Sequence, residues 1–420
     1  MKKNLLKIVQ WFLKILAGLK IRRVKPKIIA ISGSFGKTST KEAIYYLLSK
    51  KFGSDVGKNW GNMNSVIGLP LAILGLKKYS FGVEFFWDII KAKWGFFFHH
   101  LAKILVLELG IDKPGEMKQL LEIVTPNIAV LTGISETHLL ELKNISGVKR
   151  EKLLLLNALK ANGTAILNAD DANLSDFTLA SGIKKITFGK APADISYSDS
   201  KLSISGTQFI LKIKEDSKVV NSKLIGEHSI YTLLAAAAVA DEFSININEI
   251  VSGLESITSQ KGRMNIIKAK NVITIIDDSY NSNPCSAIEA LNTLKKIEFP
   301  GRKTAILGNM NELGNYTKQG HLKVGEEAGE SVDLLIVVGD NAKYLAEGAE
   351  KAGLEKEKIY SFKSTDETID QVGDLLKAGD LVLIKASQNK MHFERIIKYL
   401  LDDSEMAKKV LVRQEKKWLQ

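Results

Sequence analysis

The chain of 420 residues contains one cysteine, Cys285, and only 7 prolines. A single cysteine excludes an internal disulfide framework and is typical of a reducing compartment. It also leaves no cysteine cluster of the kind that binds structural zinc. No uninterrupted apolar run approaches the roughly 18–20 residues that a membrane-spanning helix needs. The N-terminus carries no small-residue cleavage signature, so a signal peptide is not expected.

The composition is that of a globular protein with a basic surface. A length of 420 residues predicts two or three domains, and a hydrophobic content of 45% is ample for their cores. The net charge of +12 favours anionic partners such as nucleotides, phosphorylated substrates or a membrane surface. No nucleic-acid-binding module is recognisable, so we expect no nucleic acid partner.

Residues 27–39 have the pattern of a phosphate-binding loop. The β-branched run Lys27–Ile31 predicts a buried parallel strand, and a helical pattern over Thr40–Lys50 follows it. Between the two, glycines allow a tight turn whose backbone N–H groups face a polyphosphate, at the N-terminus of the helix. A lysine of such a loop reaches the β- and γ-phosphates, and the next hydroxyl holds Mg²⁺. The candidate phosphate residues are Gly33, Ser34, Gly36, Lys37, Thr38 and Ser39.

This loop departs from the common eight-residue form, because Ile31 stands where the first glycine would fall. A Gly-Ser turn with a surface lysine is the alternative interpretation. Strand, glycines, Lys-Thr and helix nevertheless occur together in the right order, which favours nucleotide binding.

Strands alternating with helices predict an α/β fold with mostly parallel sheets. We divide the chain into an N-terminal helix over 1–25, a central P-loop domain over 26–260 and a Rossmann-like C-terminal domain over 261–420. A small β-rich section is expected within the central domain over Ile186–Ile213. The other predicted elements are strands at Ile104–Leu109, Ile128–Thr132, Val272–Asp277, Thr304–Leu307, Leu334–Val338 and Leu381–Lys385, and helices at Tyr231–Phe243 and Glu405–Gln420.

Two candidate metal ligands follow the buried strands of the central domain. Glu108 ends the strand Ile104–Leu109, and His138 comes shortly after the strand Ile128–Thr132. Ligands bind at the carboxyl edge of a parallel sheet, so both are placed where a metal near the P-loop would lie. A solvated strand-end carboxylate and a structural histidine are the alternatives.

The C-terminal domain has a polar run after its first strand, from Asp277 to Pro284. Its carboxylate and amide groups can hydrogen-bond ribose hydroxyls and an adenine edge, although a polar turn would use the same residues. Arg263 precedes this run and is a candidate phosphate ligand. The candidate nucleoside residues are Asp278, Asn281 and Asn283.

The N-terminus has the pattern of a basic amphipathic helix. Lys3, Lys7 and Lys14 fall on one helical face, and an apolar face that includes Val9 and Leu13 is opposite. Such a helix can lie in a membrane interface, or can simply pack on the domain. A second candidate is the aromatic-dense stretch 81–98, which is either a membrane- or partner-facing element or a buried helix.

Ten motifs in order resemble those of the Mur ligases, over residues 26 to about 415. The resemblance is greatest to the branch that adds D-alanyl-D-alanine to a UDP-N-acetylmuramoyl-tripeptide. The family's first domain, which grips the UDP end of the substrate, has no counterpart in the 26 residues before the first strand. The motifs are Ser32–Ser39, Gly61–Pro70, Leu107–Gly115, His138, Asn162–Asp171, Gly226–His228, Gly262–Met264, Asp277–Pro284, Leu307–Gly314 and Lys385–Ser387.

The resemblance implies an ATP- and Mg²⁺-dependent ligase that forms an amide bond through an acyl phosphate. It implies that Thr38, Glu108 and His138 hold Mg²⁺, and that Lys152 is carbamylated and holds a second Mg²⁺. Lys37, Lys152 and His138 are then the catalytic residues. Ala386 and Gln388 depart from the family pattern where the incoming substrate is expected, so the acceptor stays open.

The expected partners are therefore a nucleotide-linked peptide and an amino acid or dipeptide. The expected protein is a monomer of the cytoplasm, with a peripheral contact at the inner face of the membrane. Two alternatives remain: a different amide ligase, for folate polyglutamate or another wall polymer, and a non-catalytic nucleotide-binding protein.

Overall fold

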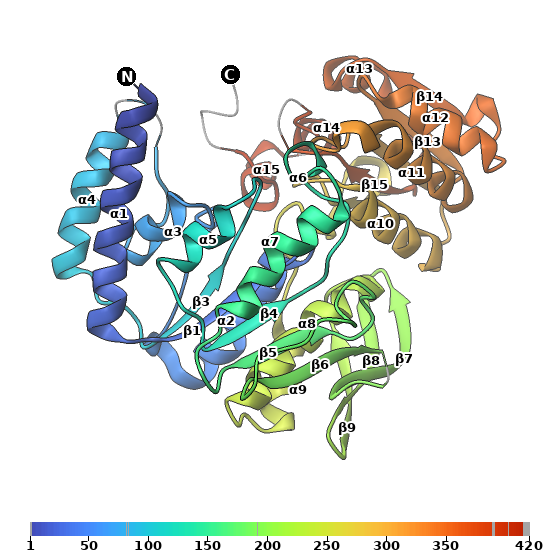
Figure 1. Ribbon diagram of the computed structural model, residues 1–420. Coiled ribbons are helices and arrows are strands. Elements are labelled where there is room, and N and C mark those ends of the chain that lie inside the picture. Colours follow the sequence, from blue (N-terminus) through green and yellow to red (C-terminus); the bar gives the residue numbers. More distant parts are fainter. Residues whose placement is uncertain are drawn as a thin grey trace. The chain divides into compact units, whose positions relative to one another are not determined.

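The computed structural model describes residues 2–80, 82, 84–190, 192–388, 391–401 and 403–414. The chain forms two compact units. Unit 1 comprises 1–199, 209–220 and 230–256, and unit 2 comprises 200–208, 221–229 and 257–420. The α/β prediction with mostly parallel sheets is confirmed (Figure 1).

A nine-stranded sheet runs in the order β2-β3-β1-β4-β5-β6-β7-β8-β9. Its centre is β1, which pairs in parallel with β3 on one side and β4 on the other. All of β1 after Lys27 is buried, which explains its continuous run of apolar residues. The strands are β1 Lys27–Ser32, β2 Val56–Lys58, β3 Ile104–Glu108, β4 Ile128–Leu131, β5 Thr164–Asn168, β6 Lys184–Lys190, β7 Ile195–Ser203, β8 Gly206–Ile213 and β9 Asp216–Ser222.

Helices accompany this sheet and place the loops that follow β1, β3 and β4. Among them α2 contacts β1 and β3, and α7 contacts β1 and β4. The predicted helices at Thr40–Lys50 and Tyr231–Phe243 are confirmed as α2 and α8, and α8 ends one residue earlier than predicted, at Glu242. The helices are α1 Lys2–Val24, α2 Lys37–Phe52, α3 Gly68–Ile73, α4 Glu84–Phe98, α5 Glu116–Leu121, α6 Leu139–Leu142, α7 Ile145–Asn157, α8 Glu227–Glu242 and α9 Ile247–Ser256.

The second sheet has six strands in the order β10-β11-β15-β12-β13-β14. Its strands are parallel except for β10, which pairs antiparallel with β11. The predicted strands are confirmed, whereas the edge strands β10 and β14 were not predicted. The elements are β10 Asn265–Lys268, β11 Thr274–Asp277, β12 Lys303–Gly308, β13 Leu334–Val338, β14 Ile359–Phe362, β15 Leu381–Lys385, α10 Pro284–Lys296, α11 Thr317–Ser331, α12 Ala342–Lys351, α13 Thr365–Leu375, α14 Glu394–Leu400 and α15 Ser404–Val410.

Two predicted boundaries in unit 2 are wrong. The first strand begins at Thr274 rather than Val272, because 270–272 form a 3₁₀ turn in which Asn271 has a φ of 53°. The C-terminal helix ends at Val410, and Leu411 leaves it in an extended conformation. Residues 415–420 of that predicted helix lie outside the described residues.

The N-terminal helix α1 packs along α3 and α4 (Figure 1). Leu13 and Ala17 are fully buried in this packing, so the predicted apolar face serves partly as core. A different apolar stripe, formed by Ile8, Trp11 and Ile15, is exposed. None of the helices in the described part of the chain combines the length and the hydropathy that crossing a membrane requires.

The aromatic stretch forms α4, and the interpretation of this helix as buried is wrong for its largest side chains. Trp87, Trp94 and Phe98 are 60%, 61% and 74% exposed. Only Asp88 and Ala92 of α4 are buried among its described side chains. Phe81, which belongs to the same stretch, lies outside the described residues.

Candidate functional site

The phosphate-binding loop connects β1 to α2 with two glycines in unusual conformations. Gly33 has a φ of +150°, and a Cβ built on it would lie 2.0 Å from the Thr132 hydroxyl oxygen. Gly36 has a φ of 70° and is the N-cap of α2, where it supplies no side-chain hydrogen bond. A glycine is therefore required at both positions, at the first for space and at the second for the left-handed backbone. The N-terminus of α2, where the first N–H groups of a helix lack intrahelical acceptors, follows directly.

Hydrogen bonds join this loop to the segment that follows β4. The Ser34 hydroxyl donates to the Ser135 carbonyl over 3.1 Å and accepts from the Ser135 N–H over 2.9 Å. The Thr132 hydroxyl donates to the Phe35 carbonyl over 2.5 Å. The shape of the loop is thus set by the neighbouring strand as well as by its own glycines.

Two lysines converge on one backbone oxygen of the loop. The Lys37 Nζ donates to the Gly33 carbonyl over 2.8 Å, and the Lys152 Nζ donates to the same carbonyl over 2.7 Å. Lys152 lies on α7 and is fully buried. Burial lowers the pKa of Lys152 well below its ordinary value, and the charge of Lys37 lowers it further. A lowered pKa favours the neutral amine, which is the form that reacts with CO₂.

Glu108 ends β3 and is almost completely buried, with an exposed fraction of 2%. Its Oε1 accepts from the Asn64 side chain over 2.8 Å. Its Oε2 has no hydrogen-bond partner and lies 3.6 Å from the Nζ of Lys41, which is itself fully buried on α2. The carboxylate is therefore positioned by Asn64 and by the ion pair with Lys41, and its Oε2 accepts no hydrogen bond.

His138 stands at the start of α6, where its φ is 54°. Its Nδ1 lies 3.4 Å from the Asp112 carboxylate, and one fifth of its side chain is exposed. Glu151, next to Lys152, accepts from the Gly115 N–H over 2.8 Å with Oε1, while its buried Oε2 lacks a hydrogen-bond partner. The loops after β3 and β4 are thus linked through His138 and Asp112.

The residues present fit a Mg²⁺ ion only in part as they stand. No group of three or more histidine, cysteine or acidic side chains that could hold a metal occurs within the described ranges. The Oε2 of Glu108, which accepts no hydrogen bond, is one suitable oxygen ligand. A carbamate on Lys152 would add a second anionic group, so the fit to Mg²⁺ depends on that modification.

Unit 2 holds the polar loop after β11. Asp277 is fully buried and accepts from the Gly262 N–H and from Ser279, and burial raises its pKa to about 6. Asp278 forms a 2.5 Å ion pair with Lys385, which also donates to the Asn281 carbonyl over 3.0 Å. Lys385 ends the neighbouring strand β15 and is 2% exposed. Asp278 and Asn281 are therefore held together by a single buried lysine.

Asn283 has a local structural role that its candidate role did not foresee. Its side chain accepts from the Ser286 N–H and caps α10, with Pro284 in the first turn. The guanidinium of Arg263 lies over the Tyr280 ring, 4.3 Å from its centre. The loop after β11 thus presents an Arg–Tyr stack beside the Asp278 pair.

Sequence reasoning missed two lysines that position the site carboxylates. Lys41 lies four residues after Lys37 on α2, and this spacing places both on one side of the helix. Lys385 was noted in a motif but not as the partner of Asp278. A lysine at the end of an apolar strand was the available signal, because a cation in such a buried place needs an anion.

The Mur ligase middle domain model matches residues 31–240, and the model of the Mur ligase glutamate ligase domain matches residues 262–388. The UDP-N-acetylmuramoyl-tripeptide–D-alanyl-D-alanine ligase of Bacillus subtilis is 29% identical over 92% of this chain and 78% of that enzyme. A crystal structure of MurF from Acinetobacter baumannii superposes with a TM-score of 0.80 at 26% identity, covering 94% of this chain and 81% of that one. A MurF ligase of Thermotoga maritima in complex with ADP superposes with a TM-score of 0.78 at 26% identity, covering 95% and 84%.

Proposed function

The chain belongs to the Mur ligase family, and on that premise we propose that it is an ATP-dependent, ADP-forming ligase of peptidoglycan precursor synthesis. The two matched family models span both units of the chain. Among its similar structures is a MurF ligase that holds ADP. The observation that carries the proposal is the P-loop with Lys37 and Lys152 on one carbonyl, because it joins a phosphate-binding lysine to a lysine suited to carbamylation.

In the proposed reaction a peptide carboxylate attacks the γ-phosphate of ATP, so that an acyl phosphate forms and ADP leaves. An amine then attacks the acyl carbon, forms the amide bond and expels phosphate. Lys37 would lie against the β- and γ-phosphates and offset the negative charge of the phosphoryl group in transfer. The loop residues Gly33, Ser34, Gly36, Thr38 and Ser39 would hold the rest of the triphosphate.

We propose Mg²⁺ as the metal, held by Thr38, Glu108, His138 and a carbamylated Lys152. Mg²⁺ neutralises phosphate charge when bound. The Oε2 of Glu108, which accepts no hydrogen bond, supports this set, as does the lowered pKa of Lys152. Carbamylation would turn the buried ammonium into an anion and would relieve its repulsion with Lys37.

We propose that the nucleoside of ATP is bound by Asp278, Asn281 and Asn283, and that Arg263 binds a phosphate. The ion pair between Asp278 and Lys385 supports a preformed arrangement of these groups. Since the Oδ1 of Asn283 already caps α10, its amide nitrogen would be the group that contacts the nucleoside.

The proposed substrates are a UDP-N-acetylmuramoyl peptide and D-alanyl-D-alanine or a similar amine. ADP release should be measured with this pair, with folate plus glutamate and with ATP alone, each for the wild type and Lys37→Ala. Release that needs the nucleotide-linked peptide and is lost in the variant supports the proposal. Release with folate and glutamate alone would indicate another amide ligase, and nucleotide binding without release would indicate a non-catalytic protein.

We propose that the protein works as a monomer in the cytoplasm, at the inner face of the membrane. The helix α1 supports this location, since Lys2–Val24 contains seven lysines and arginines and no acidic residue.

A further inference from the structure

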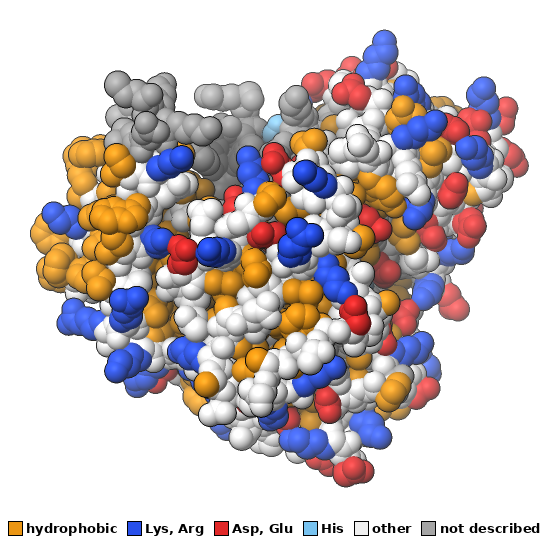
Figure 2. All heavy atoms as spheres, in the orientation of Figure 1, with side chains coloured by type: hydrophobic (Ala, Val, Ile, Leu, Met, Phe, Trp, Pro, Cys, Tyr) orange, Lys and Arg blue, Asp and Glu red, His pale blue; other side chains and the backbone are white. Residues whose placement is uncertain are grey.

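Exposed apolar side chains are concentrated on two neighbouring helices, α1 and α4. Eleven of the eighteen large hydrophobic side chains that are exposed among the described residues belong to these two helices. Hydrophobic side chains gather on the surface over α1 and α4 (Figure 2). We name these eleven residues the α1–α4 face: Leu6, Ile8, Trp11, Ile15, Leu19, Val24, Phe86, Trp87, Trp94, Phe97 and Phe98.

The two helices are held to each other and to the domain, so the face is a built surface. Leu13, Ala17 and Ala92 are fully buried. The buried Nζ of Lys20 on α1 donates to the carbonyl of Gly95 on α4. A Cβ at Gly95 would lie 1.8 Å from the Leu74 carbonyl oxygen, so α4 packs against the end of α3 without room for a side chain there.

The charges on the two helices that carry this face are mainly positive. The two helices carry nine lysines and arginines and only two acidic residues, Glu84 and Asp88. Lys7 is exposed one helical turn before Trp11. Lys91 is exposed within one turn of both Trp87 and Trp94. Basic side chains therefore alternate with tryptophans, as they do on helices that lie in the interface of an anionic bilayer.

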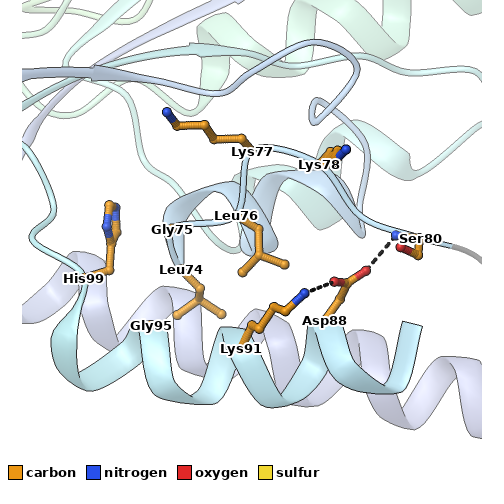
Figure 3. Close-up of a pocket in the computed structure, with 10 residues that line it drawn as sticks. All are labelled: Leu74, Gly75, Leu76, Lys77, Lys78, Ser80, Asp88, Lys91, Gly95 and His99. Atoms are coloured by element: carbon orange, nitrogen blue, oxygen red, sulfur yellow. Dashed lines mark hydrogen bonds and ion pairs between the residues drawn. The ribbon is translucent and has the colours of Figure 1, made fainter. Parts of the chain in front are cut away.

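A cavity of about 380 Å³ lies between α4 and the segment 74–80, which adds two further lysines (Figure 3). Its lining includes Lys77, Lys78 and Lys91, and one acidic residue, Asp88. The Asp88 carboxylate already has two partners: it accepts a hydrogen bond from the Ser80 N–H over 2.6 Å and lies 3.6 Å from the Lys91 Nζ. The lysines of the cavity leave an excess of positive charge next to the aromatic side chains.

We propose that the α1–α4 face docks the protein on an anionic lipid bilayer. The aromatic rings of α4 and the apolar stripe of α1 enter the interfacial region, and the cavity lysines meet lipid phosphates. A second copy of the chain is a poorer occupant, since two such faces would bring their like charges together. The inference deepens the proposed location, and it concerns residues other than those of the proposed ligase site.

The first experiment is flotation of the full chain with vesicles of phosphatidylcholine plus phosphatidylglycerol, and of phosphatidylcholine alone. The wild type should float with the anionic vesicles at low salt and less at high salt. The double variant Trp87→Ser, Trp94→Ser should lose about tenfold in vesicle partitioning. The matched control Tyr360→Ser, Tyr399→Ser removes exposed aromatic rings of unit 2 and should float like the wild type.

The second experiment locates the contact by quenching of tryptophan fluorescence with brominated lipids. Quenching of the wild type should fall strongly in Trp87→Ser, Trp94→Ser. ADP release by the same variant is the control for folding, and Trp94→Gln alone replaces the double variant if release is lost. Normal ADP release without flotation would overturn the docking proposal and leave the ligase proposal standing. Flotation without ADP release would support the docking proposal and overturn the ligase proposal.

Two other outcomes would also overturn the docking proposal. In one, the double variant and the wild type float and are quenched equally. In the other, the wild type sediments as a dimer that the double variant converts to a monomer, which would assign the face to a second copy.

Discussion

Lys37 and Lys152 donate hydrogen bonds to one atom, the carbonyl oxygen of Gly33, over 2.8 and 2.7 Å. Burial disfavours the ammonium form of Lys152, and the nearby charge of Lys37 on the same acceptor disfavours it further. The pKa of Lys152 is accordingly well below its ordinary value. The predicted phosphate-binding loop thus lies between Lys37, whose ammonium group can bind an anion, and Lys152, whose amine loses its proton more easily than an ordinary lysine.

The lowered pKa of Lys152 predicts a pH-dependent change of stability. Above this lowered pKa and below the ordinary value of 10.5, the unfolded chain binds more protons than the folded chain, so stability rises with pH. We expect Lys152→Met to have a larger free energy of unfolding than the wild type at neutral pH, and the difference to shrink toward pH 10.5. Urea unfolding in CO₂-free buffer measures both.

Lys149→Met is the matched control, because Lys149 lies on the same helix and pairs with Asp176 at the surface. The difference in free energy of unfolding between the wild type and Lys149→Met should not shrink in this way toward pH 10.5. A constant difference between the wild type and Lys152→Met across the range would contradict a lowered pKa.

Removal of the Lys152 amine should make the proposed carbamate impossible. We expect Lys152→Ala to release ADP at a rate about 100-fold or more below that of the wild type. Acetate should restore part of the rate, because a small carboxylate can occupy the space of the carbamate. The measurement is ADP release with increasing acetate, with Lys149→Ala as the control. Full activity of Lys152→Ala without acetate would sink the carbamate hypothesis.

Lys37→Ala should abolish ATP turnover and keep the fold, since Lys37 is the lysine that we propose lies against the phosphates. A loss of about 100-fold or more in rate is expected. Lys50→Ala, near the other end of the same helix, is the control and should turn over ATP normally. ADP release and circular dichroism are the measurements. Wild-type turnover by Lys37→Ala would show that the loop is not the ATP site.

Glu108 and Lys41 should be coupled in stability. Glu108→Gln removes one of the two carboxylates near the fully buried Lys41 and leaves Glu42 at 3.3 Å, so the free energy of unfolding should fall by up to about 3 kcal/mol. Glu108→Gln combined with Lys41→Met should recover much of this loss, because no uncompensated cation remains. Urea unfolding of the two single variants and the double variant forms a thermodynamic cycle. Additive effects would mean that the pair is not coupled.

Lys385→Met should weaken nucleotide binding without removing a proposed ligand. The substitution breaks the 2.5 Å pair with Asp278 and the bond to the Asn281 carbonyl. We expect about tenfold weaker ADP binding by titration calorimetry, since a truncated buried pair loses its positioning effect. The exposed Lys377→Met is the control. Unchanged affinity in Lys385→Met would argue against a nucleotide at this loop.

The local parts of this protein could be predicted from the sequence. Lys27–Ser32 reads as a buried strand because every residue after Lys27 is buried between two parallel neighbours. The turn at Gly33 and Gly36 and the helix after it follow from residues that are adjacent in the chain. The same is true of Glu108 at the end of its strand, so the sheet edge was placed correctly.

Contacts between distant residues were decided by the tertiary structure. The burial of Lys152 depends on the packing of α7 beside β1, which are more than a hundred residues apart in sequence. Strand β14 was missed because two of its four residues, Tyr360 and Ser361, are exposed, and such an edge lacks a continuous apolar run.

The N-terminal helix shows the same division. Its sequence determines a basic helix with apolar residues around most of its circumference, and both a membrane and a protein core can accept such a helix. Packing against α3 and α4 selects Leu13 and Ala17 for the core and leaves Ile8 and Trp11 exposed. Which apolar stripe meets solvent is set by the surface that the helix packs against, and only the tertiary structure contains that surface.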